Sequence, residues 1–447
     1  MGEFFGTDGI RGVAGQFPLD ESTIERIGWS LTKELTARHG KAPVIVIGRD
    51  TRESGAWIEA AVARGIAAAN GEFHCAGIIT TPGVAYLTRH IKADAGIVIS
   101  ASHNPYRDNG LKVFAPSGQK LDEATEQAIE SDLKAEASTF PSFTATATST
   151  EPDLQEKYLH FLRDEIGLGL DLKHLRIVLD CANGAASALA PSLFTALGAS
   201  IAAINADPNG RNINLDCGSL HPEKLQQAVA EHNADIGIAF DGDADRSLYV
   251  DERGNLVDGD QVLFVMATYF AARQQLVGNR VVATVMSNLG LELALQERDI
   301  TLVRTGVGDK YVLEELLKNG GSIGGEQSGH IIFPGISLAG DGMITALEVL
   351  RAMTDGGNSL SKLTSGFRHY PQVIINVRVA RKPPLDSIAP IKAAMDKLEA
   401  ELTGKGRLLL RYSGTENLAR VMIEGQDEAV IRQQAEEMAK LLKENLR

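Results

Sequence analysis

The fold of this chain is best predicted from one stretch, Gly96-Ile97-Val98-Ile99-Ser100-Ala101-Ser102-His103-Asn104-Pro105. Its β-branched residues predict a short buried strand, which gives way to small polar residues and stops at Pro105. A strand that ends in this way delivers a hydroxyl to the edge of a sheet, where ligands of open α/β sheets usually bind. Ser102 and His103 place a possible nucleophile beside a possible base. An ordinary polar turn explains these residues equally well.

Length and composition narrow the classes that the rest of the chain can belong to. At 447 residues the chain is too long for one core, and 44% hydrophobic and 23% charged residues are ordinary for a globular protein. A net charge of −14 argues against nucleic acid or an anionic membrane as partner, although a local basic cluster can still bind a small anion. No apolar run is long enough to cross a bilayer.

The cysteines and the first residues of the chain bear on its compartment. The three cysteines, Cys75, Cys181 and Cys217, are odd in number and widely spaced, which is typical of a reducing environment. Residues 1–8 show neither the basic nor the apolar region of a secretory signal. We therefore expect a cytoplasmic location.

A strand, a turn containing Gly or Ser, and a helix recur three times, with strands predicted over 42–47, 175–180 and 280–285. Each unit is followed by a second strand that ends in a loop rich in functional groups. After Phe367 the pattern changes to the strands and amphipathic helices of a smaller α+β domain. We therefore predict an α/β protein with three similar mixed α/β domains plus a smaller C-terminal α+β domain.

Three carboxylates alternate with small residues in the loop Asp241-Gly242-Asp243-Ala244-Asp245-Arg246. At this spacing they can converge on one side of a turn, where they would repel one another unless a cation is bound. Oxygen ligands favour Mg²⁺, Mn²⁺ or Ca²⁺ over Zn²⁺. Three ligands are few for a closed Mg²⁺ site, so we expect another from elsewhere, most simply a phosphate oxygen near Ser102.

An EF-hand is the rival interpretation of this loop. Glu252 stands at the twelfth position counted from Asp241, as in an EF-hand. Arg246, however, stands at the sixth position, where that loop needs Gly, and the flanking residues resemble strands. The EF-hand is therefore disfavoured.

Three further loops concentrate polar groups. Gly324–His330 packs a carboxylate, an amide, a hydroxyl and an imidazole among glycines, which suits the hydroxyl-rich edge of a sugar. Arg411–Asn417 offers a guanidinium, hydroxyls and a Gly, with Arg420 nearby, and predicts a phosphate nest. Phe5–Gly12 is a glycine-rich loop in which Arg11 could contact a ligand, or simply a flexible turn.

Taken in order, these loops resemble the motifs of the α-D-phosphohexomutase superfamily, and the resemblance covers the whole chain. The ending Gln327-Ser328-Gly329-His330 most resembles the bacterial branch that acts on glucosamine phosphates. The resemblance implies four domains around a central cleft. They are a phosphoserine-loop domain (1–152), a metal-binding domain (153–254), a sugar-binding domain (255–366) and a phosphate-binding C-terminal domain (367–447).

The resemblance also implies an activity. It is the interconversion of glucosamine 6-phosphate and glucosamine 1-phosphate through a phosphorylated Ser102 and a 1,6-bisphosphate intermediate, in the synthesis of cell-wall amino-sugar precursors. One Mg²⁺ per chain would be held by Asp241, Asp243, Asp245 and the phosphate on Ser102. The partner implied is a small sugar phosphate, and the resemblance suggests a homodimer.

Roles for the other loop residues follow from their chemistry and from what the resemblance implies. Arg246 and Arg11 could stabilise charge on the transferring phosphoryl group, and either His103 or Lys112 could move the proton of the attacking sugar hydroxyl. The expected substrate-binding residues are Glu326, Gln327, Ser328, His330, Asp309 and Lys310. The expected residues for the phosphate that is not reacting are Arg411, Ser413, Gly414, Thr415, Asn417 and Arg420.

Three alternatives compete with this interpretation. A phosphatase with a phosphoserine intermediate would usually show two metals with His ligands, and no such cluster is seen in the sequence. A mutase for glucose or mannose phosphates from the same superfamily is nearer, and Gln327 argues against it. A non-catalytic Ca²⁺-binding protein would keep the aspartates but has no use for Ser102.

Overall fold

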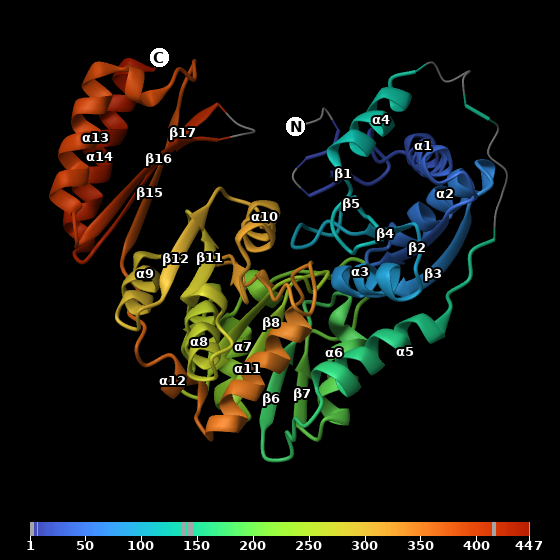
Figure 1. The fold of residues 1–447 in the computed structure, drawn as a ribbon, viewed down its shortest axis with the longest axis horizontal. Coiled ribbons are helices and arrows are strands. Elements are labelled where there is room, and N and C mark those ends of the chain that lie inside the picture. The colour runs from blue at the N-terminus through green and yellow to red at the C-terminus, as the bar shows by residue number, and fades with distance from the viewer. Residues whose placement is uncertain (1–3, 7, 136–139, 142–146, 414–416, 447) are drawn as a thin grey trace.

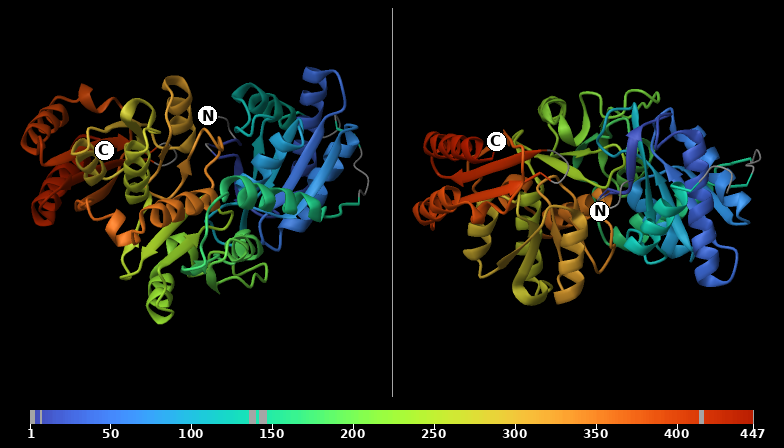
Figure 2. Two further views of the ribbon diagram at one scale, coloured as in Figure 1. Left: turned by 60° about the horizontal axis from the view of Figure 1, so that its bottom comes forward. Right: turned by 90° about the horizontal axis from the view of Figure 1, so that it is seen from above.

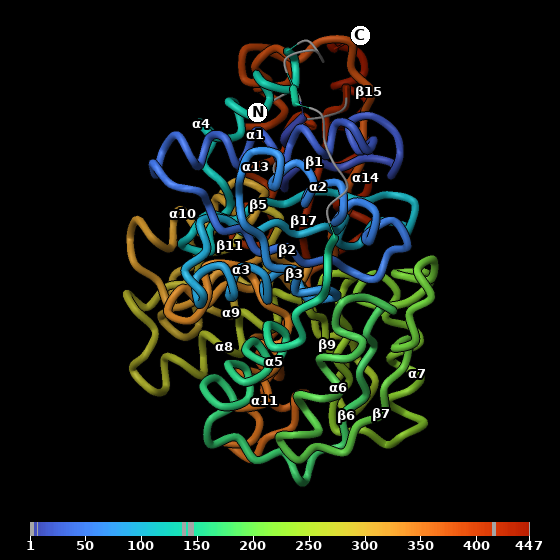
Figure 3. Tube along the Cα trace, turned by 90° about the vertical axis from the view of Figure 1, so that its right-hand side faces the viewer, coloured from blue at the N-terminus to red at the C-terminus, as the bar shows by residue number. Residues whose placement is uncertain are grey.

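The computed structural model describes residues 4–6, 8–135, 140–141, 147–413 and 417–446, which form four units, each built on one sheet (Figure 1). The units follow one another along an arc, from the N-terminal unit at the upper right to the C-terminal unit at the upper left. Two further views keep these two units on opposite sides of the molecule (Figure 2). Seen from the side of the N-terminal unit, the second and third units lie below it (Figure 3).

The first unit has a five-stranded sheet in the order β1-β5-β4-β2-β3, in which β4, β2 and β3 are parallel and β5 is antiparallel to both of its neighbours, β4 and β1. Ile97 and Ile99 of β4 pack into one core with residues of α1 and α2, whereas Val98 packs into another with residues of α3. Helices therefore cover both faces, and β4 is buried throughout, as the run before Ser102 predicts. The elements are β1 (Ile10–Val13), α1 (Glu21–His39), β2 (Val44–Arg49), α2 (Gly55–Ala68), β3 (Glu72–Ile78), α3 (Thr81–His90), β4 (Ala95–Ile99), β5 (Asp108–Phe114) and α4 (Glu123–Leu133).

The second and third units repeat this plan. In each, a first strand is flanked by two parallel neighbours, and an antiparallel strand adds to the later one, in the orders β10-β9-β8-β6-β7 and β12-β11-β13-β14. The second unit contains α5 (Pro152–His160), β6 (Arg176–Asp180), α6 (Ala186–Ala196), β7 (Ser200–Ile204), α7 (Glu223–Glu231), β8 (Ile236–Phe240), β9 (Ser247–Asp251) and β10 (Leu256–Val257). The third contains α8 (Gly259–Ala272), β11 (Arg280–Thr284), α9 (Leu289–Gln296), β12 (Thr301–Thr305), α10 (Asp309–Asn319), β13 (Gly324–Gly325), β14 (Ile331–Ile332), α11 (Gly342–Gly356) and α12 (Leu360–Leu363). The prediction of three similar α/β units is confirmed.

The strand before the loop Gly324–His330 lies slightly later than its sequence predicts. Ser322 and Ile323 look like the end of a strand, but the paired residues are Gly324 and Gly325, between β11 and β14. Tertiary pairing overrides the low strand propensity of glycine here. A Cβ at Gly324 would lie 2.7 Å from the carbonyl oxygen of Val282, so the close backbone approach requires a residue without one.

The C-terminal unit is a three-stranded antiparallel sheet in the order β15-β17-β16 with α13 and α14 packed against it. It has its own hydrophobic core, as expected for a smaller α+β domain. Its elements are β15 (Gln372–Arg378), α13 (Ala389–Leu402), β16 (Gly406–Tyr412), β17 (Leu418–Gly425) and α14 (Glu428–Asn445). Among the described helices of the whole chain, none is both long and apolar enough to cross a membrane.

Candidate active site

Ser102 lies just beyond the carboxyl end of β4, buried against the second unit. Its side chain is 1% exposed, and its Oγ donates a 2.6 Å hydrogen bond to Oδ2 of Asp241. Its backbone is left-handed, with φ of 53°, which is uncommon for a residue other than glycine and often marks a functional constraint. The backbone N–H of Ser102 donates to Oγ of Ser100 at 2.9 Å, which helps to fix the turn.

Two residues that the sequence did not identify as part of the site hold the Ser102 loop through hydrogen bonds to its carbonyl oxygens. Arg52, in the loop after β2, donates from Nη2 to the carbonyl oxygens of Ser102 (3.0 Å) and Asn104 (2.9 Å). Nδ2 of Asn214 donates to the same two oxygens, at 2.9 and 3.1 Å. Arg52 is itself fully buried and paired with Asp50, so the loop is held rigidly from two units.

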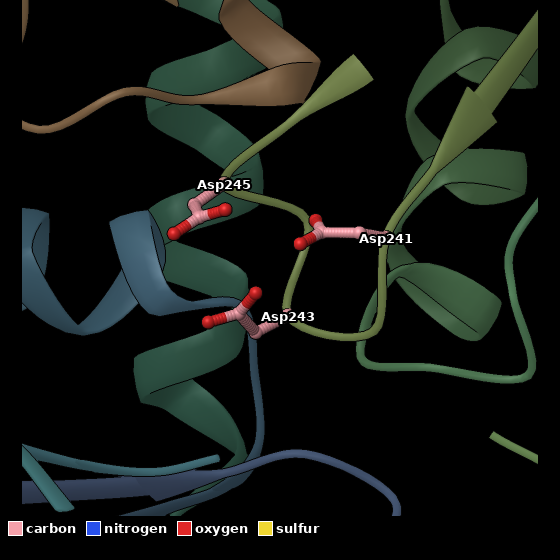
Figure 4. Close-up of side chains that lie close together, drawn as sticks. All are labelled: Asp241, Asp243 and Asp245. Atoms are coloured by element: carbon pink, nitrogen blue, oxygen red, sulfur yellow. The ribbon is translucent and has the colours of Figure 1, made fainter. Parts of the chain in front are cut away.

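Asp241, Asp243 and Asp245 lie in the turn between β8 and β9, and their carboxylates gather on one side of it (Figure 4). One ligand atom from each lies within 4.8 Å of the others, and all three side chains are buried. Burial, together with the charges of Asp245 and Asp243, raises the pKa of Asp241 well above its usual range. Oδ1 of Asp243 and Oδ1 of Asp245 are buried, and none of the described residues donates a hydrogen bond to either atom.

This arrangement fits a hard divalent cation. Unpartnered buried carboxylate oxygens that face one another are costly unless positive charge lies between them. The flanking elements are strands, and Glu252 is bound to the backbone N–H of Ser361 at 3.3 Å, outside the cluster. The EF-hand alternative is therefore excluded by the geometry.

Lys112, on β5, already supplies part of the positive charge. Its Nζ lies 2.9 Å from Asp243, 3.1 Å from Asp245 and 3.1 Å from Asp8. Burial alone would lower the pKa of Lys112, but the three carboxylates raise it well above its usual range. In this arrangement Lys112 is an ammonium that neutralises the carboxylates.

His103 and Arg246 meet on the other side of Ser102. Nδ1 of His103 lies 3.3 Å from Ser102 Oγ and 3.3 Å from Nη1 of Arg246. Burial, and then the charges of Arg246 and Arg11, lower the pKa of His103 to about 4, so the imidazole is neutral at pH 7. Arg11, on β1, is paired with Asp8.

The loop Gly324–His330, which the sequence predicts to bind a sugar, is held by hydrogen bonds to neighbouring loops. Oε1 of Glu326 accepts a hydrogen bond from the N–H of Gly308 at 3.2 Å, and Oε2 accepts one from Ser328 Oγ at 3.3 Å. Gln327 instead donates to Oδ2 of Asp258 at 3.2 Å. The carboxylate of Glu326 thus links Ser328 to Gly308, in the loop that precedes α10.

His330 connects this loop to the aspartate cluster. Its Nδ1 lies 3.8 Å from Asp245 and its Nε2 lies 3.6 Å from Asp309. Burial lowers the pKa of His330, but the two carboxylates outweigh it and raise the pKa to about 9. Lys310, the neighbour of Asp309, points to Glu123 of the first unit at 2.5 Å.

The predicted phosphate nest lies in the C-terminal unit, apart from this cluster. Arg411 and Arg420 face each other across β16 and β17, and Nη2 of Arg411 contacts Sδ of Met286 in the third unit at 3.8 Å. The N–H of Ser413 donates to Leu418, and the carbonyl of Asn417 accepts from Val379. The predicted residues Gly414 and Thr415 lie outside the described residues.

Comparisons with known proteins agree along the whole chain. Four profiles of one family match successive segments, described as phosphoglucomutase/phosphomannomutase alpha/beta/alpha domain I (residues 2–140), domain II (156–254), domain III (258–370) and C-terminal domain (374–441). A protein of Solibacter usitatus named phosphoglucosamine mutase is 50% identical over 425 residues, covering 95% of this chain and 94% of the relative.

Solved structures give the same fold. A phosphoglucomutase/phosphomannomutase family protein from Burkholderia thailandensis superposes with a TM-score of 0.79 at 25% identity, covering 98% of this chain and 96% of that one. An N-acetylphosphoglucosamine mutase of Aspergillus fumigatus, solved with GlcNAc-6P and magnesium, gives a TM-score of 0.69, covering 99% of this chain and 96% of that one. At 19% identity this second likeness shows the fold alone.

Proposed function

The chain belongs to the phosphoglucomutase/phosphomannomutase family, and we propose that it interconverts glucosamine 6-phosphate and glucosamine 1-phosphate. The observation that carries the proposal is the position of Ser102, whose buried Oγ lies 2.6 Å from Asp241 in a carboxylate cluster suited to a divalent cation. The substrate follows from the relatives, since a protein named phosphoglucosamine mutase is half identical over nearly the whole chain.

We propose that Ser102 carries the phosphoryl group between turnovers. The P–Oγ bond breaks as a sugar hydroxyl oxygen at C1 or C6 forms a new bond to phosphorus, which gives the 1,6-bisphosphate. The bisphosphate then reorients in the cleft, and its other phosphoryl group is transferred to Ser102 Oγ. Phosphoryl transfer of this kind depends mainly on positioning and on neutralising charge.

Asp241, Asp243 and Asp245 would hold Mg²⁺, with the phosphate on Ser102 as a further ligand. When bound, the ion would neutralise charge on the phosphoryl oxygens. Support comes from Oδ1 of Asp243 and Oδ1 of Asp245, which are buried and accept no hydrogen bond from any described residue.

The other residues around Ser102 have complementary proposed roles. Arg246 and Arg11 would stabilise charge on the transferring group, since both guanidinium groups are close enough to His103 to lower its pKa. His103, neutral and 3.3 Å from Ser102 Oγ, can accept a proton, whereas Lys112 must first lose one to act as a base. The charge states therefore favour His103 over Lys112 for proton movement.

Substrate is proposed to lie between two groups of residues. Glu326 and Ser328 would contact sugar hydroxyls, and Asp309 and His330, which line the cavity beside the aspartate cluster, would contribute further polar groups. Arg411 and Arg420 would hold the phosphate that is not reacting, because two facing guanidinium groups form a site for an anion. The remaining residues proposed for these two sites are Gln327, Lys310, Ser413, Gly414, Thr415 and Asn417.

Three further points are part of the proposal. The domains are 1–152, 153–254, 255–366 and 367–447, and each described strand except β10 lies in the domain that contains the rest of its sheet. The location is cytoplasmic, supported by three buried cysteines with free thiols. The protein forms a homodimer, as the resemblance suggests.

The decisive test replaces Ser102 with Ala and Ser117, an exposed serine of the same unit, with Ala as a control. We expect Ser102→Ala to abolish turnover of glucosamine 1-phosphate and to remove the mass of one phosphoryl group from the intact protein. Ser117→Ala should do neither. Full turnover by Ser102→Ala would refute the phosphoserine mechanism.

The family description itself favours a second candidate, a mutase for glucose or mannose phosphates. Measuring kcat/KM with glucosamine, glucose and mannose 6-phosphates distinguishes the two. We expect the highest value with glucosamine 6-phosphate, and a clear preference for another sugar would overturn the choice of substrate.

A further inference from the structure

Six side chains form a closed ring beside the aspartate cluster, in which basic and acidic groups alternate. Three belong to the first unit, one to the second and two to the third, so the ring joins three units. In order, with the distance to the next member, the ring consists of Lys112 (3.1 Å), Asp245 (3.8 Å), His330 (3.6 Å), Asp309 (2.8 Å), Lys120 (2.8 Å) and Asp8 (3.1 Å, back to Lys112). We call these six residues the charge ring.

Lys120 makes the two shortest contacts of the charge ring. Its Nζ lies 2.8 Å from Oδ1 of Asp8 and 2.8 Å from Oδ1 of Asp309. Asp8 precedes β1 in the first unit, and Asp309 is the first residue of α10 in the third. Lys120 is therefore the bridge that closes the ring between these two units.

Asp8 and Asp309 are each linked to residues of the proposed active site. Asp8 is also paired with Arg11 and with Lys112. Asp309 follows Gly308, whose N–H holds the carboxylate of Glu326. A shift of either carboxylate would therefore move a group proposed to contact the substrate or the transferring phosphoryl group.

The positions of the six charged side chains depend on electrostatic attraction between them more than on packing. All six members line one cavity of about 260 Å³, whose remaining wall includes Phe114, Leu313 and Leu317. Open space on that side leaves the charged groups without the close packing that fixes a core. Three ring members (Lys112, Asp245 and His330) are buried and three are partly exposed, so the attraction between opposite charges is stronger than in water and can set the position of both loops.

We propose that Lys120 is a positioning residue for phosphoryl transfer, which holds the loop of Arg11 against the loop that supports Glu326. This inference rests on the proposed function only for its kinetic consequence. Without the ammonium, Asp8 and Asp309 face each other as like charges, and the two loops separate. Misplacement of catalytic groups by about 1 Å can cost on the order of 100-fold in rate.

The test compares Lys120→Met, Lys120→Arg and the control Lys33→Met, which removes a surface lysine paired with Asp132 inside the first unit. We expect kcat for glucosamine 1-phosphate to fall about 10–100-fold in Lys120→Met with KM changed less than about threefold, because loop positioning acts on the transition state. Lys120→Arg should restore most of kcat, and Lys33→Met should match the unchanged protein. A normal kcat in folded Lys120→Met would overturn the proposal.

A second measurement separates this inference from the proposed function. Amide hydrogen exchange of residues 304–312 reports whether that loop is released, whatever the protein catalyses. We expect faster exchange there in Lys120→Met and unchanged exchange in Lys33→Met and Lys120→Arg. If the unchanged protein turns over no sugar phosphate, the proposed function fails while the exchange result still decides the role of Lys120. Equal exchange in all variants would refute that role.

Discussion

Arg411 lies directly opposite Arg420 on the paired strands β16 and β17, so two guanidinium groups share one face of the C-terminal sheet. Burial and the charge of Arg420 lower the pKa of Arg411. Two neighbouring cations repel each other, and an anion bound between them would relieve the repulsion. The pair therefore offers a phosphate two cationic groups on one face of the sheet.

Replacing Arg411 with Gln should weaken substrate binding much more than it slows the chemistry. Loss of charge-assisted hydrogen bonds worth about 1.5–3 kcal/mol corresponds to a rise in KM of about 10–100-fold. Steady-state kinetics with glucosamine 1-phosphate measure the effect. Arg432→Gln, an exposed arginine on α14 of the same unit, is the control and should leave KM unchanged. A fall in kcat at constant KM would contradict the assignment.

Removal of divalent metal should lower the melting temperature, because the three buried carboxylates then repel one another. Magnesium at 100 times its dissociation constant should add about 2.7 kcal/mol to the free energy of unfolding. Asp241→Asn should lose this stabilisation. In EDTA at pH 8 it should melt above the unchanged protein, since the ionised form of Asp241 is disfavoured in the fold.

Calorimetry with and without Mg²⁺ tests both parts, and Asp171→Asn, an exposed aspartate, serves as control. If Asp241→Asn responded to Mg²⁺ like the unchanged protein, the aspartate cluster would not be the metal site.

Local sequence pattern predicted the parts of the site whose residues are close together in the chain. The β-branched run before Ser102 indicates β4, and the alternation of Asp241, Asp243 and Asp245 indicates their convergence, since both depend on backbone geometry over a few residues. The sequence pattern ends the strand at Ile323, before the paired residues Gly324 and Gly325, because the pairing depends on strands that are distant in the sequence.

Residues that act across units could not be found in this way. Asn214 is 112 residues from Ser102, and Lys120 is 189 residues from Asp309. Nothing in the neighbouring sequence distinguishes such a lysine from a solvated one. Arg52 had a weak signal, since Asp50 and Arg52 follow a strand that the α/β pattern places next to β4, but its hold on the Ser102 loop requires the folded topology.

Asp260 should make stability depend on pH. Burial, together with the charge of Asp258, raises its pKa to about 7 in the folded protein from an ordinary value of 3.8. A group with a raised folded pKa stabilises the fold below its unfolded pKa and loses that contribution as pH rises through the folded pKa. We therefore expect the melting temperature to fall between pH 4 and about 7.

Asp260→Asn should flatten this part of the pH profile, because an amide does not titrate. The amide oxygen can still accept the hydrogen bond from the N–H of Asn288, so this contact is kept. Melting curves at constant ionic strength measure the slope for this variant, for the unchanged protein and for the exposed control Asp153→Asn. An unchanged slope in Asp260→Asn would show that other groups cause the dependence.

Arg407 should couple the C-terminal unit to the third unit. It binds the fully buried carboxylate of Glu424 at 2.6 Å and donates to the carbonyl oxygens of Val285 and Ser287, at 2.8 and 2.9 Å. Arg411 lies four residues later on the same strand. The contact that docks the two units is thus close to the proposed phosphate site.

Arg407→Met should therefore destabilise the protein and also raise KM. Removing one partner of a buried ion pair costs about 3–5 kcal/mol, because the remaining carboxylate of Glu424 is left without its cation. The double variant Arg407→Met/Glu424→Gln should recover part of this loss, since the uncompensated charge is gone, but not the raised KM, since the bonds to Val285 and Ser287 remain absent. Melting curves and KM for the two single variants and the double variant measure both effects. Additive losses of stability would show that Glu424 and Arg407 act independently, and an unchanged KM would show that the phosphate site does not depend on this docking contact.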